Sequence, residues 1–241
     1  MINVSEAERI LTEFIVKKQE VASKTAEEIK QTMPMILSLL DEFDKQKELL
    51  REKHELTSPY INIFDILKLG HKEMLHSRIL GWLFKLDETH EQGSLFLELF
   101  AEEYGVSISS ATNYEVRLED ADEESRIDIR VLQKNQFMIC IENKIFSSEG
   151  EDQTLREYRD AKQKAKEYGI DLSNIKCFYL TIDGEAAEDQ QHFKSISWYD
   201  MCSLIEDYSK KAKSEKVRWF VSQYVESIRN TIKERNHGKY L

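Results

Sequence analysis

Proline and glycine are scarce in this chain: its 241 residues include only 2 Pro and 8 Gly. Both residue types are common in long loops, so their scarcity argues against a loop-dominated protein and favours one rich in helices. The hydrophobic fraction of 41% is large enough for a real core. The length suits one domain with appendages or two small domains.

Long apolar runs are also missing, and none approaches the roughly 20 residues that span a bilayer. The first residues, MINVSEAERI, carry acids and no apolar stretch, which argues against a secretory signal. We therefore expect no membrane association. The cysteines Cys140, Cys177 and Cys202 are far apart and lack C-x-x-C spacing. They indicate buried free thiols in a reducing cytoplasm, with no zinc site.

Positive charge is in deficit, with a formal net charge of -11. That balance argues against a protein that coats nucleic acid by charge alone. The segment 207–241 departs from it, with nine Lys or Arg against four acids. The helix predicted at 214–235 therefore has two interpretations: an amphipathic helix with a solvated basic face, or a surface that faces phosphates.

The pattern of apolar residues divides the chain into a helical arm, residues 1–55, and a second domain, residues 56–241. In the second domain, helical spacing alternates with extended runs. Strands are predicted at 113–119, 126–132, 136–145 and 175–183, with a short edge strand after them. The order of elements is α-β-β-β-α-β, which predicts an α/β fold with a mixed central sheet flanked by helices. The arm makes a homodimer through the N-terminal helices plausible.

The strand that reads FMICIENKI is apolar until it reaches Glu142 and Lys144. Side chains two positions apart share one face of a strand, so these two groups point the same way. The preceding strand alternates, with Ile127, Ile129 and Val131 expected on one side and Asp128 on the other. The short KNQ segment between the strands predicts a hairpin, which would bring Asp128 beside the other two charged groups.

Two carboxylates on rigid strands provide part of a Mg²⁺ site, and a neighbouring lysine can stabilise negative charge on a phosphoryl transition state. A simpler alternative is that Asp128, Glu142 and Lys144 form a structural ion pair, worth under about 1 kcal/mol. The spacing alone occurs by chance in many proteins of this size.

Taken together, the motifs resemble those of the PD-(D/E)XK nuclease superfamily, the fold of type II restriction enzymes. The order of elements matches its αβββαβ core, with helical additions at both ends. An uncharacterised bacterial and phage subgroup is more similar still, because it shares the motifs EMLHS, LFLELF, RIDI, IENKI and DQTLREY, found here between residues 73 and 158.

The resemblance implies a role for each matching residue. Asp128 and Glu142 would bind Mg²⁺, for which Mn²⁺ is expected to substitute. Lys144 would be the catalytic lysine. Glu73 would add a metal contact, and Gln153 would lie near the metal or the nucleic-acid backbone.

The resemblance gives no clear role to three other matching residues. His76 and Ser77 match subgroup positions whose role the sequence does not give. Tyr158 departs from the Q-x-x-x-Y spacing of recombination-type nucleases, because four residues separate it from Gln153.

The resemblance also implies a function: nucleic-acid cleavage, with DNA favoured over RNA by the habits of the superfamily, in bacterial or phage defence, restriction or repair. Two alternatives remain open. One is a catalytically inactive nucleic-acid-binding protein on the same fold. The other is a helix-mediated interaction module in which the arm and the basic tail act, and metal binding separates it from an enzyme.

Overall fold

The computed structural model describes residues 61–70, 72–121 and 126–238, with scattered helical positions between 33 and 50. The chain divides into two units, residues 1–61 and 62–241, and the fold below is that of the second. Most of the predicted arm, residues 1–55, lies outside the described residues. The arm, its boundary and a dimer through it therefore stay predictions.

The elements of the second unit follow the predicted order. Its strands are β1 (Glu115–Ala121), β2 (Arg126–Gln133), β3 (Phe137–Lys144), β4 (Ile175–Thr181) and β5 (Phe193–Ser197). Its helices are α2 (Ile63–Ile66), α3 (Glu73–Phe84), α4 (Leu95–Tyr104), α5 (Gln153–Glu167), α6 (Trp198–Lys211) and α7 (Glu215–Gly238), with a short 3-10 helix at Leu172–Asn174.

The five strands form one mixed sheet in the order β1-β2-β3-β4-β5. Strands β1, β2 and β3 are antiparallel neighbours, and β2 pairs with β3 across the tight turn at 134–136. Strand β4 lies parallel to β3, and β5 lies parallel to β4 at the edge. The predicted hairpin, mixed sheet and edge strand are all confirmed. Because β3 is central and covered on both faces, it is continuously apolar until its last three residues.

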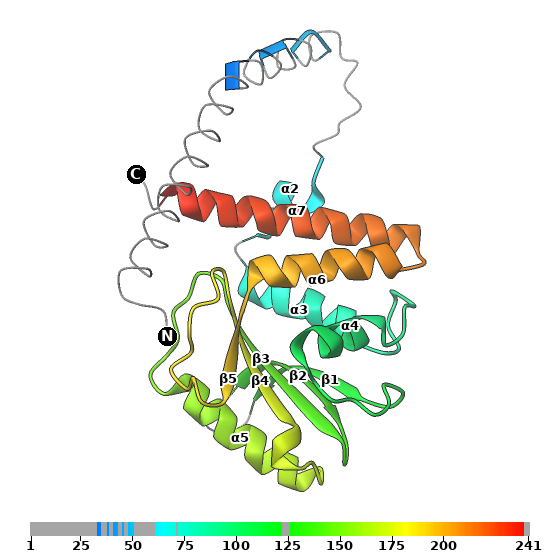
Figure 1. Ribbon diagram of the computed structural model, residues 1–241, viewed down its shortest axis with the longest axis vertical. Coiled ribbons are helices and arrows are strands. Elements are labelled where there is room, and N and C mark those ends of the chain that lie inside the picture. The colour runs from blue at the N-terminus through cyan, green and yellow to red at the C-terminus, as the bar shows by residue number, and fades with distance from the viewer. Residues whose placement is uncertain are drawn as a thin grey trace, which may run out of the picture. The chain divides into compact units, whose positions relative to one another are not determined.

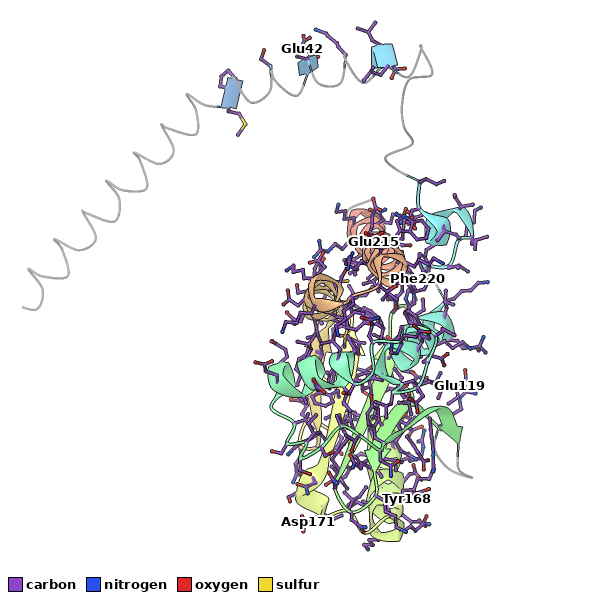
Figure 2. All side chains as sticks on the ribbon, turned by 90° about the vertical axis from the view of Figure 1, so that its right-hand side faces the viewer. Glu42, Glu119, Tyr168, Asp171, Glu215 and Phe220 are labelled. Atoms are coloured by element: carbon purple, nitrogen blue, oxygen red, sulfur yellow. The ribbon has the colours of Figure 1, made fainter. Side chains whose placement is uncertain are left out.

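Helices cover both faces of the sheet (Figure 1). Helix α5 packs on one face, whereas α3, α4 and α6 cover the other and α7 packs on α6. Figure 2 shows the two outer layers at opposite ends of the second unit, with Phe220 on α7 and Tyr168 just beyond α5. Helix α3 approaches β1 closely at Gly81, where an added Cβ would lie 2.5 Å from Leu118. Among the described residues, no helix is both long and apolar enough to cross a membrane.

One detail of the predicted alternation is wrong. Ile129 and Val131 belong to the core under α3, α4 and α6, but Ile127 packs in the cluster under α5. The pairing of β2 with β1 passes from Ile129 to Ile127 without Asp128, and the pairing with β3 ends at Ile129. The backbone of β1 is left-handed at Glu119, with φ of 51°. Regular pleating is therefore interrupted next to Asp128, and Ile127 turns to the other face.

Helix α7 buries the apolar stripe that the sequence predicts: Val217, Val221, Tyr224, Ile228 and Ile232. Two of its basic residues have partners within the chain. Arg218 donates to the carbonyls of Ala212 and Lys213, and Arg229 pairs with Glu206 at 2.9 Å. These contacts favour the amphipathic interpretation over a phosphate-facing surface.

The face of the sheet under α5 contains a buried charge pair. Arg130 on β2 is fully buried and donates to Asp160 on α5, and Lys164 lies 3.1 Å from the same carboxylate. The three cysteines are free and buried as predicted, and Cys140 and Cys177 are partners in the β3–β4 register beside this pair.

We expect Asp160→Ala to lower the free energy of unfolding by about 3 kcal/mol, because it removes the carboxylate that compensates Arg130 in the core. Urea denaturation measures the change. The control is Glu167→Ala, an exposed acid on the same helix, for which we expect little change. Equal stability of the two variants would show that Asp160 does not hold the core together.

Candidate active site at the end of strand β3

The alternation of β3 sends its last three side chains to opposite faces. Glu142 and Lys144 lie on the α5 face, where Lys144 Nζ is 2.8 Å from Glu142 Oε1. Asn143 points to the other face, where it donates to Ser77 Oγ on α3 and accepts from Trp198 Nε1 on α6. All three are largely buried. One short strand segment therefore builds the charged site and also ties the site to the helices behind the sheet.

Asp128 lies where β2 and β3 separate. Its Oδ2 accepts a hydrogen bond of 2.9 Å from the backbone N–H of Asn143. The end of the β2–β3 ladder leaves this N–H for the carboxylate, because Ile129 and Ile141 are the last pair. Asp128 is thereby fixed beside the strand segment that carries Glu142 and Lys144, as the hairpin predicted.

Helix α5 brings two more groups to the site. The amide nitrogen of Gln153, in the first turn, donates to Glu142 Oε1 at 2.6 Å and to Glu157 Oε1 at 2.7 Å. The Oε2 atoms of both glutamates are buried and have no hydrogen-bond partner. Gln153 was predicted near the site, but Glu157 was not. The spacing between them contained the signal, because residues four apart share a face of a helix.

Glu73, in the first turn of α3, holds the loop that follows β3. Its Oε1 accepts from the backbone N–H groups of Ile145, Phe146 and Ser147 at 2.8 to 2.9 Å, and Ser147 Oγ donates to Oε2 at 2.8 Å. Burial alone would raise the pKa of Glu73, but the hydrogen bonds from Ser147, Phe146 and Ile145 outweigh it and lower the pKa. Glu73 thus fixes the backbone just beyond Lys144.

These side chains line one cavity of about 450 Å³. Its lining contains all five site residues predicted from the sequence, and it also contains Glu157. Among the described residues of its lining, five are acids and three are bases: Glu73, Glu119, Asp128, Glu142 and Glu157 against Arg126, Lys144 and Arg156. A phosphate would therefore lie among acidic side chains, and a bound cation would reduce their repulsion of it.

A sequence model of the PD-(D/E)XK nuclease superfamily matches residues 61–238, which include every element of this site. The chain belongs to the PD-(D/E)XK nuclease superfamily. No curated protein and no solved structure matches it significantly. The restriction-endonuclease-like fold expected from the motifs is therefore confirmed, and the superfamily's nuclease chemistry becomes the framework for the site.

The acids of this superfamily member perturb one another. Burial raises the pKa of Asp128, and the charge of Glu142 raises it further, to about 7. Burial and the charge of Glu142 also raise the pKa of Glu157, to about 10. Burial alone would lower the pKa of Lys144, but Glu142, with Asp128 and Glu73, holds it above its usual value. Lys144 is therefore a cation at neutral pH.

The oxygen atoms present fit a hard divalent cation. Within the described part of the chain, no three or more His, Cys, Asp or Glu side chains are placed closely enough to hold a metal as they stand. However, Asp128 and Glu142 supply carboxylate oxygens, and Glu142 Oε2 is buried without a donor. Carboxylate oxygens are the protein ligands that Mg²⁺ prefers, usually one or two with waters and substrate phosphates completing the shell. The donor set therefore suits Mg²⁺ or Mn²⁺.

His76 and Ser77 gain structural explanations. His76 is buried, with its two ring nitrogens 3.0 Å from Tyr224 Oη on α7 and from the Gly70 carbonyl. Ser77 donates to the Glu73 carbonyl and accepts from Asn143. Both residues point away from the cavity and secure α3 behind it. Tyr158 also lies elsewhere, stacked on His192 with ring centroids 3.7 Å apart.

The raised pKa of Asp128 makes a prediction for the metal-free protein. Between its usual value of about 4 and about 7, the folded state keeps a proton that the unfolded state has lost, so stability falls as pH rises through this window. We expect Asp128→Asn to remove this loss, because asparagine still accepts from Asn143 and carries no charge. The variant should gain thermal stability over wild type as pH rises from 5 to 8 in EDTA. A difference in melting temperature that is constant with pH would contradict the assignment.

Glu73 makes a second prediction. We expect Glu73→Ala to speed amide hydrogen exchange at residues 145–147 and to lower stability by about 1–3 kcal/mol, because three backbone donors lose their acceptor. Hydrogen exchange read by mass spectrometry measures the change, with the exposed Glu102→Ala on α4 as the control. Unchanged exchange in this loop would show that Glu73 does not hold it.

Proposed function

We propose that this superfamily member is a divalent-metal-dependent nuclease that hydrolyses phosphodiester bonds in DNA. The observation that carries the proposal is the placement of Asp128, Glu142 and Lys144 in one cavity at the end of paired strands, inside a domain that belongs to the nuclease superfamily. We favour DNA over RNA as the substrate because members of that superfamily usually act on DNA. A role in bacterial or phage defence, restriction or repair, and a cytoplasmic location, belong to the same proposal.

The residues have separable roles in this proposal. Asp128 and Glu142 hold the metal, and Glu73 adds a contact or, through the 145–147 loop, keeps the site in shape. A bound Mg²⁺ would supply charge neutralisation and an activated water. Lys144, already a cation beside Glu142, stabilises the negative charge that develops on the phosphoryl oxygens.

Other residues suit substrate contact. Arg126 and Arg156 line the cavity and, within the described part of the chain, are its cations other than Lys144, so they are candidates for the phosphates on either side of the scissile bond. In the metal-free protein, Gln153 orients Glu142 through its 2.6 Å hydrogen bond. The acidic side chains of the cavity are the reason that we expect metal to bind before a polyanion does.

Cleavage of circular and linear DNA and of RNA with Mg²⁺ or Mn²⁺ tests the proposal. We expect wild type to cut DNA, EDTA to abolish cutting, and Asp128→Ala to be inactive because a metal ligand is lost. Lys144→Ala should lose about 100-fold or more in rate, the usual effect of removing a charge-stabilising group.

The matched control is Lys176→Ala, which removes an exposed lysine from the neighbouring strand β4 and should leave the rate unchanged. Equal cutting by wild type and both site variants would reject this site. Absence of cutting with every metal, combined with absence of Mn²⁺ binding, would favour the inactive binding protein on the same fold.

A further inference from the structure

Glu157 is a buried acid to which the proposed mechanism assigns no role. It lies on α5, is 2% exposed and lines the same cavity as Asp128 and Glu142. Its Oε1 accepts from Gln153, and its Oε2 is buried without a hydrogen-bond partner. Buried carboxylates are normally paired with cations or fully hydrogen-bonded, so this arrangement needs an explanation.

Another acid of α5 shows what a structural role looks like in this fold. Asp160, one turn further on, is paired with Arg130 and Lys164 on the same face of the sheet. Glu157 has no ion pair with any Lys or Arg in the described ranges. Its polar neighbours are instead the Gln153 amide and the other acids of the cavity. The chain therefore compensates one buried acid of this helix and leaves the other for a different partner.

The Gln153 amide marks where that partner would sit. One nitrogen, carrying partial positive charge, lies 2.6 Å from Glu142 Oε1 and 2.7 Å from Glu157 Oε1. Mg²⁺–oxygen bonds are about 2.1 Å, so a cation at the nitrogen's position would need each oxygen to move by roughly 0.5 Å. Gln153 is partly buried at the first position of its helix, and its amide oxygen accepts from the Gly150 N–H at 3.2 Å. The amide would have to turn aside to admit the cation.

We propose that Glu157 is a third carboxylate of the metal site and that, with Glu142, it binds the cation at the position that the Gln153 amide now occupies. This inference rests on the proposed metal-dependent function. It extends the ligand set from the two strands to helix α5.

Mn²⁺ binding to the full chain tests the inference without any activity assay. Isothermal titration calorimetry, with the loss of the free Mn²⁺ EPR signal as a second readout, would compare wild type with Glu157→Gln and Glu157→Asp. We expect Glu157→Gln to weaken Mn²⁺ binding at least tenfold. Glu157→Asp should bind with intermediate affinity, because it keeps the carboxylate on a shorter side chain.

The control is Glu167→Gln, which makes the same side-chain replacement at the exposed end of α5 and should bind Mn²⁺ like wild type. Circular dichroism establishes that each variant is folded. Should Glu157→Gln not fold, Glu157→Asp carries the test.

Unchanged Mn²⁺ affinity in the folded Glu157 variants, while Asp128→Asn binds weakly, would overturn the role of Glu157 and leave the nuclease proposal standing. Absence of Mn²⁺ binding by wild type would instead overturn both. Equal weakening in Glu167→Gln would show that net charge, and not Glu157, sets the affinity.

Discussion

The two-residue period of strand β3 is the constraint on which the rest of this site depends. Because successive side chains point to opposite faces, Glu142 and Lys144 enter the cavity under α5 and Asn143 enters the core under α3 and α6. The cavity keeps its geometry because the residue between its two charged groups is tied on the opposite side to Ser77 and Trp198. A one-residue slip of β3 would exchange the two sets and destroy both.

The same strand segment concentrates charge in a way that is unfavourable for the metal-free protein. Burial and repulsion by Glu142 raise the pKa values of Asp128 and Glu157. Glu142 itself contacts Lys144 and the Gln153 amide through Oε1. Clusters of this kind are unfavourable for folding and typical of functional sites. Elsewhere under the same helix, the buried Asp160 is matched by two cations.

Helix α3 serves the site from behind the sheet. Glu73 fixes the loop beyond Lys144, its carbonyl accepts from Asn143 and Ser77, and His76 anchors the helix to Tyr224 on α7. The residues of the E-x-x-H-S motif therefore position α3, and one of them, Glu73, also lines the cavity. Helix α7 then acts as the outer support of α3, and two of its arginines are engaged within the chain.

The sequence alone determined the strands, their order along the chain, the hairpin and the meeting of Asp128, Glu142 and Lys144, because strand periodicity and a three-residue turn fix which side chains share a face. Gln153 was expected near the site only from the resemblance to the superfamily. The sequence did not place Glu157 in the site, because a Gln and a Glu four residues apart on a helix are also common as an ordinary surface pair. It also misplaced Ile127, since the break in pleating beside Asp128 comes from a left-handed residue on the neighbouring strand. The roles of His76 and Ser77 were decided only by the tertiary structure. Their partners, Tyr224 and Asn143, are far away in the sequence, and only the packing of α3 between the sheet and α7 brings them within hydrogen-bonding distance.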